Sequence, residues 1–500
     1  MDFDKIKRIP DRWLIFSILI LGVYLIIRLA NFSAIIRYFP LDNVAIDFAS
    51  HMSSLHFLKA YGFHNFVPNW YNGFVLFQFY HPGWAFFTLP LLYFFKDVKI
   101  ATFLSVVLIY TLGFAFFYFL GKKIGLSKIK SVTYFLLFFA NPLSLSYLFR
   151  TGRLPELLAW IWFVLVFILV MYYRNKKLDL KFVVLLTIIY SLLFLSHILF
   201  FIVASLVIFS LFIIKNNKER AILIIPIILT ATITSFFWFD FITEVGDQRI
   251  SSFVPLQRYA SRNPIDLNDV ILGFVVPILF WVTIWLYFKN KKINGEFRFF
   301  LPIIIMSILY FTRLLLFIPI FNRATPDMYN LLFIFISIYM IMNLDLNSFS
   351  ARLKRIIFIL SFIIPILFVV ISIVNIENFS PYSIGVKNTL ELFNYIDGKF
   401  VLYNGPISEG PLVAYAAIYL NASTPQGWSP EYLTQSYLDK LNLNRNSLRN
   451  KDCTLFYNSL KNLKGKEVIV YFDDCGFLKS CSEFKLKKQI QNACLFSTIN

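Results

Sequence analysis

The sequence predicts an all-α polytopic membrane domain of about 11 transmembrane helices, followed by a small C-terminal domain of α/β or mixed type on the extracytoplasmic side. Of its 500 residues, 58% are hydrophobic and only 15% are charged, whereas a soluble domain is about 45–50% apolar. From residue 376 onward the composition becomes that of an ordinary globular domain. We therefore expect a membrane domain over residues 1–375 and an extracytoplasmic domain over residues 376–500.

Apolar runs long enough to cross a bilayer, about 17–25 residues each, recur through the first 375 residues. The run 181–214 is too long for one helix, so we divide it at Ser196-His197, where a polar turn suits the outer surface. The predicted spans are 13–30, 100–120, 131–148, 155–173, 181–196, 198–214, 221–243, 269–288, 299–320, 328–343 and 355–375.

Lys and Arg in the short loops predict the orientation, because these residues are enriched on the cytoplasmic side. With a cytoplasmic N-terminus, the predicted inner segments carry 22 basic residues and the longer outer loops carry 10. The basic residues alternate between the two sides in this way only if the apolar stretch 79–95 does not cross the membrane. Pro82, Gly83 and Pro90 interrupt that stretch and disfavour one continuous helix. We therefore predict one long exported loop over residues 31–99, with short helices at the interface.

The net charge of +19 does not indicate nucleic-acid binding. From residue 376 onward there are 13 Lys and Arg against 11 Asp and Glu, so nearly all of the excess lies between the predicted spans. Basic residues in such loops set membrane orientation and form no basic face for a phosphate backbone. The predicted partner is the lipid bilayer.

The C-terminal segment has turn signals at Asn404-Gly405-Pro406 and a strand-like run at 467–472. All four cysteines fall inside it, at Cys453, Cys475, Cys481 and Cys494. An even set in an exported segment predicts two disulfides, in any of three pairings. Metal binding is the alternative, although no two cysteines have the two-residue spacing of a zinc site.

The predicted exported loop concentrates residues that suit chemistry. His51, His56, His64 and His81, four of the five histidines, lie within 31 residues of one another. Asp47 and His51 stand four residues apart, so on a helix they share one face. A carboxylate beside an imidazole can act as a general base or bind a divalent metal ion. On spacing alone, an interfacial helix with solvated polar residues is the alternative.

Several features resemble the GT-C superfamily of integral membrane glycosyltransferases. They are a first helix that acts as a signal anchor, a long exported loop that opens with an acidic residue, Phe79-Tyr80-His81-Pro82 ahead of an apolar segment, and a span ending in Gly121-Lys-Lys-Ile-Gly125. More narrowly, Asp47-x-x-x-His51, Pro68-x-Trp70, Gly73-Phe-x-x-Phe-x-Phe-Tyr80-x-Pro82 and Thr151-Gly-Arg-Leu-Pro-Glu156 are similar to a group of prokaryotic membrane proteins. The name of that group relates it to 6-pyruvoyl-tetrahydropterin synthase and says nothing about chemistry.

The resemblance implies transfer of a sugar at the outer membrane face, from a polyprenyl-phosphate donor to a glycan, lipid or protein acceptor of the cell envelope. It also implies that an acidic residue of the first loop is the catalytic base or a ligand of a divalent metal ion, Mg²⁺ or Mn²⁺. Asp47 matches that residue by position, and Asp42 is the runner-up. We expect His51 and Glu156 to complete the catalytic set, with Asp47 and Glu156 as the candidate metal ligands.

Departure of a lipid phosphate needs positive charge near the phosphate, and Arg suits this role by permanent charge and bidentate geometry. Arg150 and Arg153 follow the third predicted span, and Arg323 lies in a later outer loop. Glu156 is one turn from Arg153, so a purely structural ion pair is the alternative for those two. The other candidate substrate-binding residues are Trp70, Tyr80, His81 and His197.

Two other functions fit parts of the sequence. A transporter or flippase for lipid-linked saccharides usually needs ionisable residues deep inside several spans, whereas here they cluster at the outer ends of helices. A non-catalytic envelope-assembly subunit would use the exported C-terminal domain to bind polymers. In that case Trp428, Tyr432 and Tyr437 stack on sugars; in the alternative they form the core of the domain.

The charge alternation predicts that Ser127 and Ser252 lie on opposite faces of the membrane. A single cysteine placed at Ser252 should react with an impermeant maleimide in intact cells, whereas one at Ser127 should react only after lysis. The unsubstituted chain, with its own cysteines oxidised, is the control. Equal labelling of both positions in intact cells contradicts the predicted topology.

Overall fold

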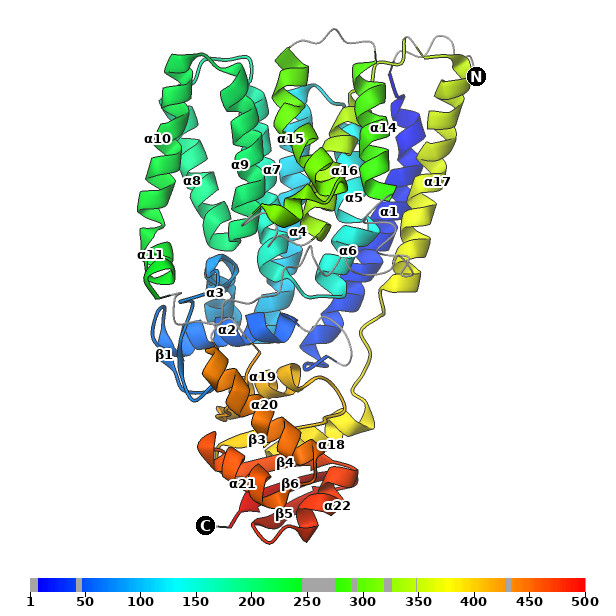
Figure 1. Ribbon diagram of the computed structural model, residues 1–500. Coiled ribbons are helices and arrows are strands. Elements are labelled where there is room, and N and C mark those ends of the chain that lie inside the picture. The colour runs from blue at the N-terminus through cyan, green and yellow to red at the C-terminus, as the bar shows by residue number, and fades with distance from the viewer. Residues whose placement is uncertain are drawn as a thin grey trace.

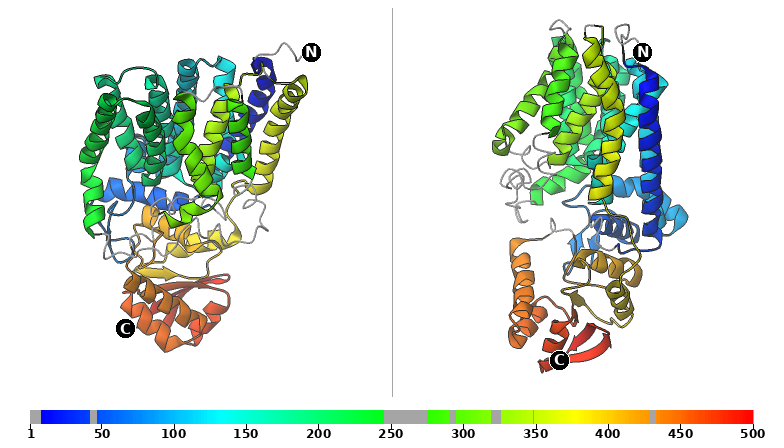
Figure 2. Two further views of the ribbon diagram at one scale, coloured as in Figure 1. Left: turned by 45° about the horizontal axis from the view of Figure 1, so that its top comes forward. Right: turned by 90° about the vertical axis from the view of Figure 1, so that its right-hand side faces the viewer.

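The computed structural model describes residues 8–41, 47–244, 275–289, 295–318, 326–347, 349–428 and 433–499. Long helices run side by side in a bundle, and the C-terminal part lies beyond one end of it (Figures 1 and 2). α1 (Asp11–Phe32) begins at the opposite end of the bundle, which is its N-terminal end. A layer of short elements from the first loop separates the bundle from the C-terminal part.

Apolar helices build the bundle and leave many large apolar side chains exposed, among them Ile26, Phe239 and Ile373. Such exposure is expected where lipid takes the place of water. Short 3-10 turns follow two of the helices, at Ser33–Ile36 and Leu314–Phe317. The bundle helices are α1 (Asp11–Phe32), α4 (Val98–Ile124), α5 (Lys128–Phe139), α6 (Pro142–Phe149), α7 (Leu154–Tyr173), α8 (Leu180–Ser196), α9 (Ile198–Ile214), α10 (Asn217–Ile233), α11 (Ser235–Glu244), α14 (Val276–Phe288), α15 (Gly295–Phe311), α16 (Pro326–Met342) and α17 (Ala351–Asn375).

The predicted count of about 11 spans is not confirmed. Within the described ranges, α1, α4, α7 and α17 are long and apolar enough to cross a membrane alone, and the pair α5–α6, bent by 53°, makes a fifth if counted as one span. The difference arises because several predicted runs are short or broken as helices. The run 221–243 divides at Thr234 into α10 and α11, and α8 and α9 have 17 residues each.

Several of the basic segments predicted to be cytoplasmic contact one another at the N-terminal end of the bundle. Arg174 pairs with Glu296 at 3.2 Å, and the Leu178 backbone N–H donates to Glu219 Oε1 at 3.2 Å. Ser127 Oγ donates to Asp11 Oδ1 at 2.7 Å. The described parts of these segments therefore lie at one end of the bundle, and the assignment of that end to the cytoplasm stays a prediction.

The first loop folds into α2 (Asp47–Tyr61), a two-stranded antiparallel hairpin of β1 (Phe66–Val67) and β2 (Phe74–Val75), and α3 (Gly83–Phe95). α2 runs across the end of the bundle (Figure 1). α3 has 13 residues, or about 20 Å at the helical rise, which is too short for a hydrocarbon core of about 30 Å. α14 is equally short, so length alone does not decide the matter, and the exported position of residues 79–95 stays a prediction.

The C-terminal part is a mixed sheet with helices packed around it. The strand order is β3-β4-β6-β5, with β3 parallel to β4 and the other pairs antiparallel. The predicted strand at 467–472 is β4, which is fully buried. The elements are α18 (Ile384–Phe393), β3 (Phe400–Leu402), α19 (Glu409–Leu420), α20 (Gln435–Arg449), α21 (Cys453–Asn462), β4 (Glu467–Tyr471), α22 (Asp473–Ser480), β5 (Phe484–Ile490) and β6 (Ala493–Thr498).

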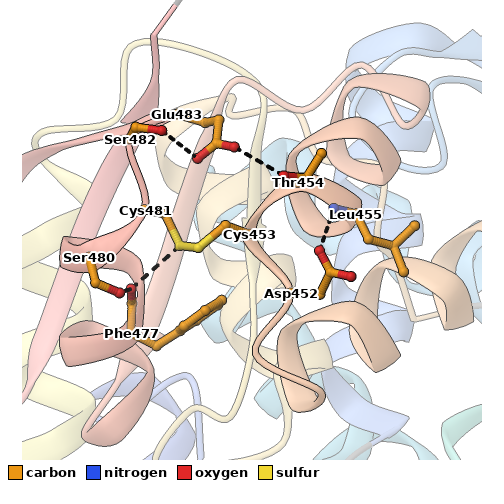
Figure 3. The surroundings of a disulfide bond; sticks show 9 residues. All are labelled: Asp452, Cys453, Thr454, Leu455, Phe477, Ser480, Cys481, Ser482 and Glu483. Carbon is orange, nitrogen blue, oxygen red and sulfur yellow. Dashed lines mark hydrogen bonds between the residues drawn. A yellow bond between two sulfur atoms is a disulfide. The ribbon is translucent and has the colours of Figure 1, made fainter.

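Two disulfides link the elements of this part: one joins α21 to the end of α22, and the other joins α22 to the sheet. Cys453, the first residue of α21, is bonded to Cys481, which follows α22 (Figure 3). Cys475 of α22 is bonded to Cys494 of β6. The sequence left three pairings open, and the structure selects this one because the chain brings α21, α22 and β6 together.

Hydrogen bonds attach the first loop to the C-terminal part. The Thr424 backbone N–H donates to the Asn69 carbonyl at 2.8 Å, and the Tyr71 N–H donates to the Gln426 carbonyl at 3.4 Å. Asn69 Nδ2 donates to the Ala422 carbonyl at 3.2 Å, and Asn72 Nδ2 donates to Tyr437 Oη at 3.0 Å. The short segment 69–72 therefore docks on residues 421–428.

Truncation of Asn69 tests this attachment. Asn69 also accepts a hydrogen bond from Tyr61 and donates one to Asn421, so Asn69→Ala leaves several part-buried polar groups unpaired. We expect the free energy of unfolding to fall by about 1–3 kcal/mol, measured by chemical unfolding in detergent. Asn388→Ala, which loses an exposed hydrogen bond to Gln491, is the control and should change it by less than about 0.5 kcal/mol. Equal effects of the two variants contradict the proposed importance of the attachment.

Candidate active site

Asp47 begins α2 at the junction of the bundle and the C-terminal part. Its backbone N–H donates to the Thr151 carbonyl at 3.2 Å, and its Oδ1 accepts a hydrogen bond from Trp428 Nε1 at 3.4 Å. A carboxylate in the first turn of a helix is favoured by the partial positive charge of that end. The carboxylate of Asp47 is therefore oriented by the first loop, the α6–α7 turn and the C-terminal part together.

The motif Thr151-Gly-Arg-Leu-Pro-Glu156 forms the turn from α6 into α7. Gly152 has φ +77°, a left-handed conformation that favours glycine, and Pro155 lies in the first turn of α7. Arg153 therefore precedes the helix and Glu156 lies in its first turn, 3.5 Å from Arg153 Nη1. The structure therefore contains the Arg153–Glu156 ion pair that the sequence offered as the structural alternative.

Arg153 lies among three carboxylates. Besides Glu156, Arg153 Nη1 is 4.0 Å from Oδ2 of Asp327, which lies in the first turn of α16. Asp47 also interacts electrostatically with Arg153. Each carboxylate thus comes from the first turn of a different helix, and the single guanidinium compensates their repulsion.

Burial raises the pKa of Asp47 above its usual value, and the Arg153 charge and the Trp428 hydrogen bond oppose this effect. A carboxylate with a raised pKa is a stronger base than an ordinary one while it remains ionised. Asp47 therefore has the electrostatic surroundings of a general base.

His81 and His197 stack on each other with ring centroids 5.0 Å apart. The Ile198 backbone N–H donates to His81 Nε2 at 3.0 Å, so in the neutral imidazole the proton is on Nδ1. His197 Nε2 lies 3.5 Å from Glu156 Oε1. The structure thereby joins the predicted residues His81, His197, Glu156 and Arg153 in one continuous cluster.

His51 lies on α2 one turn after Asp47 and is buried between Tyr80 and Trp84, with ring centroids at 5.8 Å and 5.9 Å. Burial lowers the pKa of His51 to about 3 and that of His81 to about 4, so both imidazoles are neutral at pH 7. An imidazole with so low a pKa is a weak base. These surroundings favour Asp47 over His51 as the base.

The other predicted residues lie apart from this cluster. Trp70 is fully buried, at 5.2 Å from the ring of Phe57, and its packing suits a structural role. His64 pairs with Asp240 at 3.2 Å instead of joining the cluster. Arg150 is exposed at the end of α6. The predicted residues Asp42 and Arg323 lie outside the described residues.

The described residues do not fit a divalent metal ion. No group of three or more His, Cys, Asp or Glu side chains that could hold a metal is found among them. The predicted ligands Asp47 and Glu156 are instead arranged around the cation of Arg153. We therefore derive no chemical step through a metal.

A cavity of about 360 Å³ extends from Asp47 into the C-terminal part. Of the described lining residues, Asp47 and Tyr71 come from the first loop and the others from the C-terminal part, among them Glu409, Trp428 and Arg445. The volume is within the range of about 300–1,000 Å³ for pockets that bind small molecules.

Sequence reasoning missed Asp327, Glu409 and Arg445. Asp327 follows Pro326 at the start of an apolar run, at the same predicted end of the spans as Glu156, and this was an available signal. Glu409 and Arg445 are 36 residues apart with no motif around them, so only the fold brings them together.

No protein family matches the sequence, and no curated protein is similar to it. Solved structures do resemble the fold. The Archaeoglobus fulgidus oligosaccharyltransferase in complex with zinc and sulfate matches 92% of this chain and 68% of its own, with 12% identity and a TM-score of 0.57. The arabinofuranosyltransferase AftD from Mycobacteria matches 99% of this chain and 40% of its own, with 11% identity and a TM-score of 0.61.

The fold of this chain is similar to the folds of these two membrane transferases. Another neighbour is the archaeal oligosaccharyltransferase AglB from Archaeoglobus fulgidus in complex with an inhibitory peptide and a dolichol-phosphate. It matches 90% of this chain and 69% of its own, with 11% identity and a TM-score of 0.53. The structural neighbours and the apolar helices agree on a multi-pass membrane protein. The narrower resemblance to proteins named after 6-pyruvoyl-tetrahydropterin synthase has no support, because no family matches.

Arg153 and Arg150 form a matched pair for testing the charge cluster. Arg153→Met leaves three carboxylates without their shared cation and should lower the free energy of unfolding by about 2–4 kcal/mol. Arg150→Met, three residues earlier and exposed, should change it by less than about 0.5 kcal/mol. Chemical unfolding of both variants in detergent is the measurement. A neutral result for Arg153→Met contradicts the role of Arg153 as the compensating charge.

Proposed function

We propose that the protein is a membrane glycosyltransferase that transfers a sugar from a polyprenyl-phosphate donor to an acceptor hydroxyl at the outer face. The observation that carries the proposal is Asp47, which lies both beside the Arg153 cluster at the end of the bundle and in the wall of the cavity. The GT-C-like fold supports the same reaction class. Neighbours in complex with a dolichol-phosphate and an acceptor peptide support a lipid-linked donor.

In the proposed reaction, Asp47 accepts the proton of the acceptor hydroxyl as its oxygen attacks the anomeric carbon of the donor sugar. A new glycosidic C–O bond forms, the C–O bond to the phosphate breaks, and its electron pair leaves with the lipid phosphate. Burial raises the pKa of Asp47, which favours this role near neutral pH. Trp428, which donates to Oδ1, holds the carboxylate toward the cavity.

Positive charge for the departing phosphate comes from the α6–α7 turn in this proposal. Arg153 already shares its charge with Glu156 and Asp327, so its main role is to keep the carboxylates ionised and in place. Arg150 is exposed three residues earlier and is the better candidate for the phosphate. Arg is suited to this contact by its bidentate geometry.

Asp47→Asn tests the base directly, because the amide keeps the size of the side chain and cannot accept the proton. With labelled polyprenyl-phosphate sugars and purified protein, we expect a loss of at least about 100-fold in transfer rate. Asp473→Asn, an exposed residue of α22, is the control and should retain the wild-type rate. The assay is run with and without Mg²⁺ or Mn²⁺.

Undiminished transfer by Asp47→Asn contradicts the assignment of the base. No transfer from any donor by the folded wild-type protein contradicts the glycosyltransferase and favours an envelope-assembly subunit. Transfer that requires the divalent ion would add a metal to the mechanism and would require ligands from outside the described residues.

A further inference from the structure

The cavity beside Asp47 is walled mainly by the C-terminal part, and its lining is polar as well as aromatic. Glu409 and Arg445 form an ion pair on one side. Gln426 Nε2 lies 3.4 Å from Glu409 Oε2, and Asn442 lines the cavity as an exposed amide. The lining therefore contains both donors and acceptors, which suits a ligand whose hydroxyl groups both donate and accept.

Charge argues against a phosphate in this cavity. Among the described lining residues, the charged groups are the carboxylates of Asp47 and Glu409 and the guanidinium of Arg445. Arg153 outside the lining already opposes the charge of Asp47, and Arg445 already pairs with Glu409. A phosphate would therefore find no uncompensated positive charge on this described lining, which is unfavourable where water is partly excluded. The lipid phosphate of the donor therefore belongs at the bundle side of Asp47, and the cavity suits an uncharged polar ligand.

Backbone pairing argues against an extended peptide along β3. β3 is an edge strand of the sheet, and a free edge would attract a peptide strand. The amide of Gln426 occupies this edge, because Leu402 N–H donates to Gln426 Oε1 at 2.8 Å and Gln426 Nε2 donates to the Leu402 carbonyl at 2.9 Å. The Phe400 N–H on the same strand donates to the Ser423 carbonyl at 3.1 Å, so it is also paired within the chain.

Aromatic rings complete the lining. A Cβ on Gly410 would overlap the ring of Trp428, so the indole lies directly against the first turn of α19. Tyr71 packs in the same way against Gly427, and Arg445 lies over the ring of Tyr403 at 5.7 Å. Rigid aromatic surfaces among a few oriented polar groups are typical of pockets for polar organic ligands.

We propose that this cavity binds the acceptor as the terminal unit of a saccharide, with the Glu409–Arg445 pair on its hydroxyls and its reactive hydroxyl at Asp47. This inference rests on the proposed function and names the acceptor class. The apolar face of a sugar ring packs on Trp428, and the hydroxyl rim meets Glu409, Arg445 and Asn442. The cavity thereby selects a glycan over a peptide or a lipid.

Equilibrium binding of free saccharides tests the cavity without any donor. The full chain in nanodiscs is titrated with a panel of methyl glycosides of hexoses and pentoses, and binding is followed by saturation-transfer NMR. We expect at least one glycoside to bind saturably and Arg445→Gln to weaken it about tenfold or more, the loss expected for a charged hydrogen bond. Lys440→Gln, an exposed residue on the same helix α20, should bind within about twofold of wild type.

Trp428→Tyr is a second variant that keeps an aromatic ring, and it should weaken binding without unfolding the protein. The unfolding midpoint of each variant is compared with wild type, and only folded variants are scored. In the transfer assay, Arg445→Gln should raise the KM for the acceptor and leave the KM for the donor unchanged. A purely structural role of Arg445 would not produce that separation.

The outcomes distinguish this inference from the proposed function. Saccharide binding that depends on Arg445, without transfer from any donor, overturns the glycosyltransferase and retains the cavity as a saccharide site. If transfer depends on Asp47 but Arg445→Gln leaves the KM for the acceptor unchanged, the assignment of the cavity as the acceptor site is wrong. Absence of binding by every glycoside, or transfer to a peptide that glycosides do not compete, overturns the saccharide class.

Discussion

The docking of residues 69–72 on residues 421–428 is the contact on which the site depends. Backbone hydrogen bonds from Thr424 to Asn69 and from Tyr71 to Gln426 align the two segments, and Gly427 lets the Tyr71 ring lie against the chain. A second tie connects α1 to the linker after α17, where Arg28 donates to Asn378 Oδ1 at 2.7 Å. With both ties in place, Trp428 reaches Asp47, and the cavity closes between parts of the chain that are almost 400 residues apart in sequence.

The same packing determines which charged side chains meet at the end of the bundle. Three helices begin near Arg153, and each has an acidic residue in its first turn, Asp47, Glu156 and Asp327. Helix N-termini favour carboxylates, yet three of them together require a cation. Arg153 supplies it at the α6–α7 turn, while Asp47 alone of the three also lines the cavity. Asp47 is therefore the carboxylate of the three that a molecule in the cavity would contact.

Local signals in the sequence predicted those features that depend on few neighbours. Apolar runs predicted the helical bundle, and prolines predicted the short α3. Counts of Lys and Arg predicted that the basic loops lie on one side of the membrane, and several of these loops contact one another at one end of the bundle. Asp47, Glu156, Arg153, His81 and His197 were predicted one by one from short motifs, and they lie in one region of the structure. The span count is not confirmed within the described ranges, where Thr234 and Ala140-Asn141 interrupt helices that hydropathy alone predicts as continuous.

By itself, the sequence predicted the membrane-protein class and the mixed C-terminal domain, because hydropathy and charge act over a few residues, and it indicated Asp47 through its spacing to His51 and the resemblance of the first loop to a known superfamily. Only the tertiary structure decided which side chains Asp47 meets, which cysteines pair and which residues line the cavity. Glu409 and Arg445 carry no local signal, and Trp428 was predicted only as a residue of the C-terminal domain, because the contact of Trp428 with Asp47 arises from the docking of distant segments. Asp327 joined the cluster for the same reason: the packing of α16 beside α6 and α9 brings it to Arg153.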